Sequence, residues 1–441
     1  SSAASDVYKR QLNAPCETIR RHCQHGIHEP LSVPEPQLRY DERSPFIVHM
    51  LLLAIIYLAF ISLGLPDSLV GAGWPAMHES LGVPLSCAGF ITFIIATGTI
   101  ISSLMSDRLT TRFGPGRVTA ASVALTAAAL FGFSFSTQFW VLCLWAMPYG
   151  LGAGTVDAAL NNYAALHYTA RHMNWLHGCW GLGASISPFI MSQALSSGHG
   201  WPSAYRTVGT LQAILIAIVT VSLPLWNKTR KINGGGSAKL FDHVPTRAAL
   251  ATPGVPAVLG AFFSYCAVES TSMLWAASYL VSVRGTDGAT AAAFASLFVL
   301  GITAGRFLAG FVAERIGDRM LVRGGFITVG VGVVLVGLPG VPSWVALAGL
   351  VIAGLGSAPI YPAIIHSTPT TFGAHNSQAI IGIQMAAAYV GTTLAPPLFG
   401  AISANTGLWT LPLYLIVLVI FGLVMSEHVT PVSYTHLTLP T

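Results

Sequence analysis

Long apolar runs separated by short polar turns dominate the pattern of this 441-residue chain. A membrane-spanning helix needs about 20 consecutive, mainly apolar residues. Twelve runs meet this requirement, and several contain Gly and Pro, which helices in lipid tolerate better than helices in water. The predicted spans are residues 46–76, 84–105, 117–135, 138–166, 173–196, 204–225, 254–283, 289–312, 321–339, 343–366, 378–401 and 407–426. The pattern therefore predicts an all-α integral membrane protein with twelve transmembrane helices.

The longest polar connection between spans divides the twelve into two sets of six. It covers Asn227 to Thr252, and Gly234 to Ser237 at its centre have the composition of a flexible linker. We therefore expect two six-helix halves joined by this linker. The expected boundaries are 1–45 for a doubtful N-terminal segment, 46–226 for the first half, 227–253 for the linker, 254–428 for the second half and 429–441 for a doubtful C-terminal segment.

The two ends of the chain have an unusual composition. Residues 1–11 and 432–441 resemble translated sequencing-adaptor sequence, and we exclude them from fold reasoning. Residues 12–45 are polar and lack helical periodicity. Two interpretations of them stay open: untranslated sequence ahead of a true start near Met50, or a disordered cytoplasmic tail.

A short motif occurs twice, each time directly after an apolar run. It consists of an acid–Arg pair followed by glycine and another base. The two copies comprise Asp107, Arg108, Arg112, Gly114 and Arg117, and Gly310, Glu314, Arg315, Gly317 and Arg319. Further pairs recur at nearly constant offsets, which are 207 residues from Asp107 to Glu314, 204 from Gly150 to Gly354 and 208 from Gly183 to Gly391. The two halves are therefore predicted to be parallel repeats, as in transporters that rock about a central site.

Composition and charge fit a membrane protein. The chain is 53% hydrophobic and only 8% charged, against roughly a quarter charged in an average soluble domain. Loops on one side of the predicted spans carry twelve Lys and Arg residues and loops on the other side carry two, Arg206 and Arg284. Basic loops stay in the cytoplasm, so both termini and the linker are predicted to be cytoplasmic. We expect the cell membrane as the location, and lipid rather than nucleic acid as the macromolecular surroundings.

These features resemble the major facilitator superfamily over roughly residues 46 to 428. Within it, Asp67, Asp157 with Asn161, and Glu269 are similar to the acids of the fucose–proton symporter branch and related bacterial sugar permeases. The resemblance implies transport of a small solute by a protein for which a monomer suffices. It also implies that both acid–Arg motifs hold the cytoplasmic gate between the halves, although the first copy departs from the family pattern at Ser103 and in its extra residues before Gly114.

Three acids lie well inside the predicted spans: Asp67, Asp157 and Glu269. Each costs roughly 2.5–3.5 kcal/mol at a helix centre on insertion scales, and burial favours the neutral form of a carboxyl group. We therefore expect proton coupling at Asp157 and Asp67, with Asp157 the stronger candidate and Glu269 a third. The alternative for the first two is a neutral acid bonded to a neighbouring helix. For Glu269 the alternative is a bond to Tyr265 that holds span 7 in place.

Aromatic and amide side chains at helical spacing supply candidate solute contacts. Asn161 shares the helix face of Asp157, whereas Asn162 points about 100° away. Small-ligand sites combine apolar or aromatic walls with a few polar groups. The predicted substrate-binding residues are Asn161, His177, Trp180, Tyr265, Trp275, Tyr361 and Gln384. The alternative for each aromatic or histidine is ordinary helix packing.

Arg306 is the one base within a span. We interpret it as snorkelling to the cytoplasmic edge or pairing there with a helix end, with anion binding as the other hypothesis. No nucleotide-binding GxxxxGK[ST] motif and no credible nucleophile–base pair is present, so we expect neither an enzyme nor a cofactor or metal.

The leading functional hypothesis is proton-coupled symport of a monosaccharide or similar polyhydroxy solute. A drug or metabolite exporter of the same fold is the first alternative, although span 5 lacks the GxxxGP pattern typical of such proteins, reading Gly181 to Pro188 without a Gly-Pro pair. A membrane solute sensor is the second alternative, and it would need an output domain that the sequence does not show.

Overall fold

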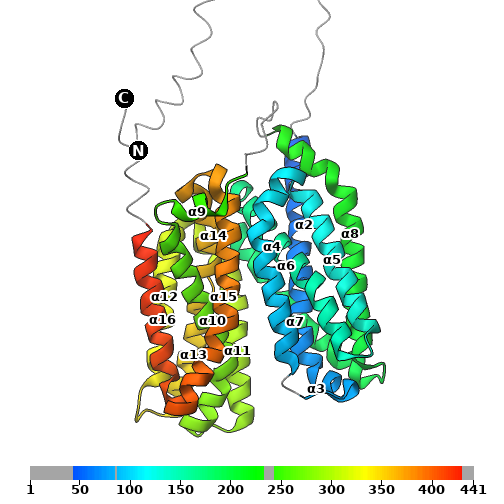
Figure 1. The fold of residues 1–441 in the computed structure, drawn as a ribbon. Helices are drawn as coiled ribbons and strands as arrows, with labels where there is room; N and C mark the ends of the chain where they lie inside the picture. The colour runs from blue at the N-terminus through cyan, green and yellow to red at the C-terminus, as the bar shows by residue number, and fades with distance from the viewer. Residues whose placement is uncertain (1–42, 85–86, 233–242, 430–441) are drawn as a thin grey trace, which may run out of the picture. The chain divides into compact units, whose positions relative to one another are not determined.

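The computed structural model describes residues 43–84, 87–232 and 243–429. These ranges contain helices and no strand, and the helices from Pro45 onward belong to one compact unit (Figure 1). The helices are α2 (Arg43–Asp67), α3 (Leu69–Leu81), α4 (Ala88–Phe113), α5 (Pro115–Phe135), α6 (Phe139–His167), α7 (Ala170–Ser196), α8 (Gly200–Ile232), α9 (Thr246–Ala251), α10 (Val255–Arg284), α11 (Gly288–Ile316), α12 (Asp318–Gly337), α13 (Ser343–Ser357), α14 (Ile360–Phe372), α15 (Ala374–Thr406), the short η2 (Leu408–Thr410) and α16 (Leu411–His428). The predicted all-α fold is confirmed.

Eleven helical stretches among the described residues are long and apolar enough to cross a membrane. They match eleven of the twelve predicted spans. Three of them combine two helical elements: α2 with α3 over Val48–Leu81, α13 with α14 over Ser343–Phe372, and η2 with α16 over Leu408–His428. The remaining predicted span, 173–196, forms the 27-residue helix α7, whose His, Asn, Gln and Ser side chains make it less apolar. The chain is a multi-pass membrane protein, and the count of twelve spans stays a prediction.

The predicted linker is partly helical. α8 continues to Ile232, six residues into the predicted linker, and α9 occupies Thr246–Ala251. The glycine-rich centre of the linker and nearly all of both doubtful end segments lie outside the described residues. The predicted boundaries at 227 and 253 stay a prediction.

The break between α2 and α3 is caused by Pro66. Proline has no N–H, so the carbonyl of Ser62, one turn earlier, loses its helical partner. The buried side chain of Gln212 on α8 donates to that carbonyl at 3.1 Å, and its amide oxygen accepts from Thr126 on α5 at 2.8 Å. The side chains of two other helices thus satisfy a backbone group that lipid would leave unpaired. The break places Asp67 at the end of α2.

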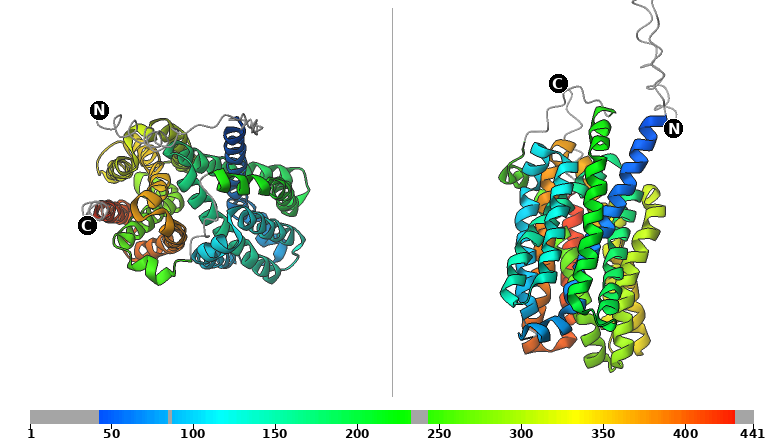
Figure 2. Two further views of the ribbon diagram at one scale, coloured as in Figure 1. Left: turned by 90° about the horizontal axis from the view of Figure 1, so that it is seen from above. Right: turned by 90° about the vertical axis from the view of Figure 1, so that its right-hand side faces the viewer.

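The helices form two groups, α2–α8 and α10–α16, and the left view of Figure 2 looks along them. In both groups, glycines at matching positions bring helices into backbone contact. A Cβ on Gly150 would meet the carbonyl of Ile95, and one on Gly354 would meet the carbonyl of Phe298. In the same way, Gly183 lies against the carbonyl of Ile61 and Gly391 against that of Phe263. Small residues permit such close approach of helices in membranes. The glycine pairs chosen from sequence offsets therefore occupy equivalent places in the two groups.

The two acid–Arg motifs end in loops of the same geometry. α4 and α11 each stop one residue before a glycine, Gly114 with φ 82° and ψ 155°, and Gly317 with φ 82° and ψ 152°. The extra residues of the first copy lengthen α4 and leave the loop unchanged. Asp107 therefore lies one helical turn further from its glycine than Glu314 does, because four residues make about one turn.

We expect Gly354→Ala to destabilise the fold, because the added methyl group would meet the Phe298 carbonyl. Overpacking of this kind costs about 1–3 kcal/mol. Denaturant unfolding in detergent micelles measures it. The matched control is Gly324→Ala on α12, where a Cβ meets nothing within 4 Å. Equal unfolding midpoints for the two variants would contradict the tight α11–α13 contact.

Candidate functional site

Asp67 receives hydrogen bonds from two aromatic side chains. The hydroxyl of Tyr149 on α6 donates to Oδ1 at 3.1 Å, and the indole Nε1 of Trp180 on α7 donates to Oδ2 at 2.9 Å. Asp67 is exposed in spite of these bonds. Its position at the helix break leaves the carboxyl group open to a ligand or to water.

Asp157 is the first member of a chain of hydrogen bonds that runs from α6 to α7. Asn161 donates through Nδ2 to Oδ1 of Asp157 at 2.8 Å and to its backbone carbonyl at 3.0 Å. The Asn161 oxygen then accepts from Nε2 of His177 at 3.0 Å, which fixes the tautomer of the histidine. Asn161 and His177 are both buried, so the network holds one face of Asp157 rigidly.

The other face of Asp157 contacts the second group of helices. The hydroxyl of Tyr389 on α15 donates to Oδ2 at 3.3 Å. Tyr149 and Trp180, which donate to Asp67, belong to the same group as Asp67, whereas Asp157 is bonded across the two groups. Of these two acids, the stronger candidate from the sequence is therefore the one that links the halves.

Arg306 on α11 lies deep within the helix bundle, with only 3% of its side chain exposed. It donates to the Tyr265 hydroxyl at 3.3 Å and to the His177 carbonyl at 3.5 Å. Its NH2 lies 3.8 Å from Oε2 of Glu269. The prediction that Arg306 snorkels to the membrane edge is wrong. The reason is that Glu269 and Tyr265, on one face of α10, provide partners for the guanidinium inside the protein.

Two of the predicted aromatic contacts surround this arginine. The guanidinium carbon lies 5.6 Å from the ring centroid of Trp180 and 6.0 Å from that of Tyr361. The Tyr361 ring also lies 4.5 Å from the ring of His177, centroid to centroid. The structure therefore brings together seven sequence-selected residues, namely Asp67, Asp157, Asn161, His177, Trp180, Tyr265 and Tyr361, with Glu269 alongside.

Two predicted substrate contacts lie elsewhere in this conformation. Trp275 donates to the Pro396 carbonyl at 3.0 Å and packs against Phe399. Gln384 is fully buried, and both of its polar atoms bond to the hydroxyl of Thr368. Both side chains therefore join α15 to helices of the same group and do not face the other residues of the site.

Sequence reasoning missed Tyr149 and Tyr389 and misjudged Arg306. Tyr149 is eight residues before Asp157, so the two share a helix face, and this spacing could have selected it. Tyr389 carries no comparable signal, because its partner lies on a helix more than two hundred residues away. The rotation of α15 against α6 decides that contact.

Further contacts between the two groups of helices lie at one end, which we call the basic end because Arg108, Arg171 and Arg315 lie there. Near this end, Asn162 donates to Gln378 at 2.8 Å and accepts from the Ser377 hydroxyl at 2.6 Å. The Asn162 side chain thus points away from Asp157, as predicted, and connects α6 to α15.

The second acid–Arg motif also connects the groups at the basic end. Glu314 accepts from Thr169 at 2.8 Å and from Arg171 at 3.3 Å. A Cβ on Gly310 would overlap the Trp175 indole, so the glycine of the motif makes room for a side chain of the opposite group. Trp175 in turn donates to the Phe307 carbonyl at 3.1 Å.

The first motif makes different contacts. Asp107 is buried and its Oδ2 bonds to Nδ1 of His243 at 2.5 Å and to the backbone N–H of Val244 at 3.1 Å. These residues follow the undescribed part of the linker. The one-turn displacement of Asp107 along α4 explains why the linker, rather than a helix of the opposite group, supplies its partners.

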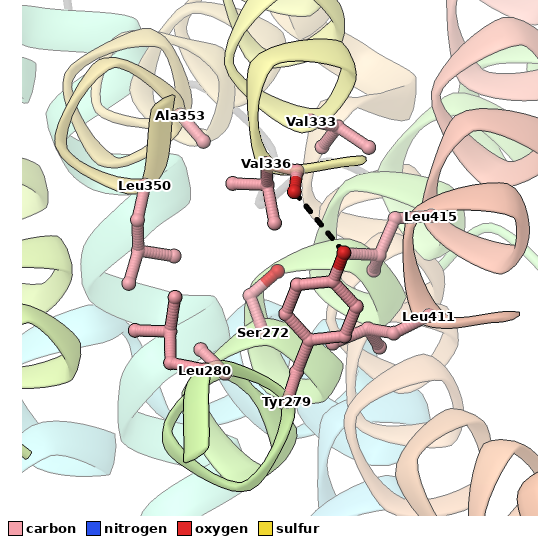
Figure 3. Close-up of a pocket in the computed structure, with 10 residues that line it drawn as sticks. Ser272, Tyr279, Leu280, Val333, Val336, Leu350, Ala353, Leu411 and Leu415 are labelled. Atoms are coloured by element: carbon pink, nitrogen blue, oxygen red, sulfur yellow. Dashed lines mark hydrogen bonds between the residues drawn. The ribbon is translucent and has the colours of Figure 1, made fainter. Parts of the chain in front are cut away.

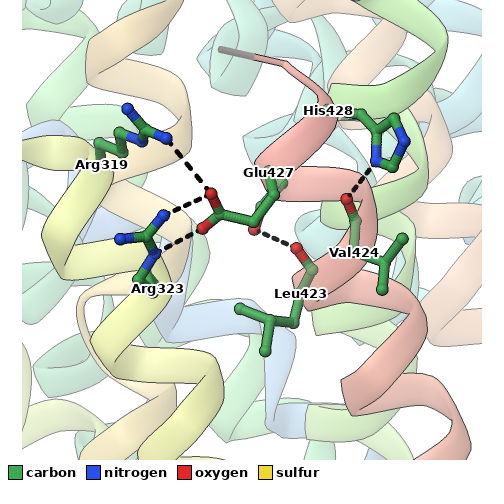
Figure 4. A network of polar contacts seen from close by, with 7 residues as sticks. Arg319, Arg323, Leu423, Val424, Glu427 and His428 are labelled. Atoms are coloured by element: carbon green, nitrogen blue, oxygen red, sulfur yellow. Dashed lines mark hydrogen bonds and ion pairs between the residues drawn. The ribbon is translucent and has the colours of Figure 1, made fainter. Parts of the chain in front are cut away.

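Beyond the second motif, Arg319 and Arg323 on α12 bind Glu427 on α16 (Figure 4). Arg323 donates to the two carboxylate oxygens at 2.6 and 2.5 Å. All three residues are partly exposed, and both ion pairs connect α12 with α16 within one group. It tethers the last described helix to the motif loop.

A separate small cavity lies between α10, α12, α13 and α16 (Figure 3). Its walls are mostly aliphatic, and the hydroxyl of Tyr279 donates to the Val336 carbonyl at 3.1 Å. None of its lining residues is charged. The cavity lies within the second group, and Ser272 and Tyr279 supply the hydroxyl groups of its lining.

The sequence matches the family model described as Major Facilitator Superfamily over residues 56–294 and 257–435. The match with Bypass of stop codon protein 6 of Saccharomyces cerevisiae is 24% identical and covers 58% of this chain but only 56% of that protein. Membrane protein MosC of Rhizobium meliloti is 24% identical over 92% of both chains. The Glucose/mannose transporter GlcP of Bacillus subtilis is 21% identical over 59% of this chain and 65% of that protein. These relatives come from both yeast and bacteria.

Solved structures share the fold. FucP, crystallised in the outward conformation, superposes with a TM-score of 0.70 and 16% identity, over 87% of this chain and 99% of that one; a second crystal structure identifies it as the fucose:proton symporter of E. coli. The proton:xylose symporter XylE superposes with a TM-score of 0.71 and 13% identity, over 88% of this chain and 95% of that one. At these identities the likeness shows the fold alone.

We expect Asn162→Ala to open the basic end, because it removes two hydrogen bonds between the groups. Each such bond contributes about 0.5–1.5 kcal/mol, so maleimide labelling of a cysteine placed at Ser106, in a background without native cysteines, should accelerate by about tenfold. The matched control is Asn174→Ala, whose amide donates within its own helix to the Ala170 carbonyl. Equal labelling rates in both variants would show that Asn162 does not hold this end closed.

Proposed function

This chain belongs to the Major Facilitator Superfamily and is therefore a membrane transporter, and we propose that it moves a monosaccharide or similar polyhydroxy solute together with protons. Transport would proceed by alternating access, in which the two groups of helices rock about the central residues. The names of FucP, XylE and GlcP support a sugar as the solute.

The observation that carries the proposal is the difference between the three central acids. Asp67 and Asp157 accept hydrogen bonds from neutral donors only, namely tyrosine, tryptophan and asparagine side chains. Glu269 instead lies beside Arg306. A carboxyl group beside a fixed positive charge serves as its counter-ion, whereas a carboxyl group with neutral hydrogen-bond partners is free to bind and release a proton. We therefore assign proton uptake and release to Asp157 and Asp67, and the role of counter-ion to Glu269.

The surroundings of these acids suit a sugar. Trp180 offers an aromatic face beside the exposed Asp67, and Tyr149 and Tyr361 supply hydroxyl groups. The gate contacts at the basic end are made, and Asp67 is exposed. With the basic end in the cytoplasm, as the charge distribution predicts, this arrangement corresponds to a carrier closed on the inside and ready to receive solute from outside.

Tyr389 offers a way for the proton to control the rocking. While Asp157 is ionised, the tyrosine donates to a carboxylate, and such charge-assisted bonds contribute about 1.5–3 kcal/mol against roughly 0.5–1.5 for neutral ones. The empty, deprotonated carrier is then held in the present state. Protonation of Asp157 weakens the bond and allows the loaded carrier to turn inward, which couples the solute to the proton.

Other titratable groups surround Asp157. Asp67 on α2, Cys266 on α10 and Tyr361 on α14 lie within electrostatic reach, as does Tyr389 itself. His177 on α7 acts through Asn161. Of these, Asp67 is the one acid.

We expect membrane vesicles that contain this protein to accumulate a radiolabelled monosaccharide above equilibrium when the outside is acidic. Collapse of the pH gradient should abolish the accumulation. Asp157→Asn should also abolish it while leaving solute exchange, because the amide mimics the protonated acid and no longer releases a proton.

Full accumulation by the Asp157→Asn variant would rule out this acid as the coupling group. Absence of sugar uptake together with gradient-driven extrusion of a dye would instead favour an exporter. Empty vesicles and vesicles with collapsed gradients are the controls for passive leakage.

We expect Tyr389→Phe to weaken the coupling without removing an acid. Labelling of a cysteine at Ser106 is measured in the full-length chain without native cysteines, and the rates are corrected for the pH dependence of thiol reactivity. Labelling should be slow at high pH and faster at low pH, and this difference should shrink several-fold in the variant. Tyr149→Phe is the matched control, since it removes a hydroxyl bond to Asp67 within one group. A pH dependence that Tyr389→Phe leaves intact would exclude Tyr389 as the connecting residue.

A further inference from the structure

Arg306 is buried but incompletely hydrogen-bonded. Its contacts with Tyr265 and His177 are long, at 3.3 and 3.5 Å, and its Nε is buried without a hydrogen-bond partner. Normal N–H···O bonds are 2.7–3.2 Å. A guanidinium carries five N–H donors, so the present contacts leave part of its bonding capacity unused.

Glu269 supplies the negative charge for this arginine without closing the pair. The two side chains approach to 3.8 Å, which is an ion pair beyond hydrogen-bond distance. The glutamate is the more accessible partner, with 16% of its side chain exposed against 3% for Arg306. A solute that reaches the pair therefore meets the carboxylate together with the edge of the guanidinium.

The charge balance at this place disfavours an anionic solute. Arg306 is matched by Glu269, so the pair carries no net charge. An added carboxylate would be repelled by Glu269 and would find the arginine already neutralised. Neutral hydroxyl groups avoid that repulsion, because they can donate to Glu269 and accept from Arg306.

We propose that Glu269 is a built-in counter-ion that restricts the site to uncharged polyhydroxy solutes and excludes sugar acids. Specificity of this kind arises from repulsion of the wrong ligand as much as from contacts with the right one. A planar guanidinium binds a carboxylate through two parallel hydrogen bonds. Arg306 would therefore bind the carboxylate of a sugar acid if Glu269 did not neutralise its charge. The proposal rests on the proposed transport of a monosaccharide and names the part of the site that selects it.

The test compares two matched pairs of ligands, D-glucose with D-glucuronate and D-galactose with D-galacturonate. Their binding to the purified full chain in detergent is measured by calorimetry. The unmodified protein should bind one or both neutral sugars and bind the corresponding acid at least about tenfold more weakly. Glu269→Gln should reverse this preference by gaining affinity for the acid, because it leaves the arginine charge unpaired while keeping the size of the side chain.

Two control variants show whether a gain in affinity comes from loss of the Glu269 counter-ion or from the loss of any negative charge in this region. A separate measurement excludes misfolding. Asp157→Asn removes a negative charge from the same region without freeing Arg306, and it should not gain affinity for the acids. The double variant Glu269→Gln with Arg306→Gln has no charge at the pair, and it should lose the gain seen in Glu269→Gln alone. A monodisperse gel-filtration profile and an unchanged helical circular dichroism spectrum confirm that each variant is folded.

The outcomes distinguish this inference from the proposed function. A folded Glu269→Gln variant with unchanged affinity for both acids overturns the counter-ion role, and so does a gain of the same size in Asp157→Asn. Absence of any monosaccharide uptake by the unmodified protein in vesicles overturns the proposed function itself.

Discussion

Lipid offers no hydrogen-bond partners, so the polar groups at the centre of this helix bundle depend on partners that other helices supply. The carbonyl that Pro66 leaves unpaired is satisfied by Gln212 on another helix. The buried charge of Arg306 is matched by Glu269 and flanked by two aromatic rings. The same requirement positions the functional residues, since a break in a helix and a buried charge are tolerated only where neighbouring helices supply hydrogen bonds. The central site thus consists of the few polar side chains and the helix break that interrupt an otherwise apolar pattern.

Much of this arrangement could be predicted from the sequence, because helix length and helix periodicity are local properties. The twenty-residue runs predicted the helices, and the glycine offsets predicted contacts that recur against Ile95 and Phe298. Periodicity also separated Asn161, which bonds to Asp157, from Asn162, which bonds to Gln378. What could not be predicted depends on the rotation of one helix against another. The partners of Arg306, the contact from Tyr389 and the packing role of Gln384 all belong to this class.

The two groups share the same backbone arrangement but carry different polar side chains. The loops at Gly114 and Gly317 have nearly identical backbone angles, and the glycine contacts occur in both groups. The first group carries the two carboxyl groups that have neutral partners, whereas the second carries the arginine and its glutamate. Even the repeated acid–Arg motif has diverged, because one extra helical turn moves Asp107 to the linker while Glu314 stays at the boundary between the groups. On the proposed function, this common scaffold would support separate tasks, proton exchange in one group and solute selection in the other.

The pairing of Arg306 with Glu269 has a consequence for membrane voltage. Moving one elementary charge across the membrane is worth about 2.3 kcal/mol per 100 mV. The arginine and the glutamate carry opposite charges and move together on the second group, so their rocking transfers almost no net charge. Asp67 and Asp157 have no such compensation, and their charge changes with protonation. On the proposed mechanism, the electrical work is therefore concentrated in the return of the empty, deprotonated carrier, and a membrane potential acts on that step alone.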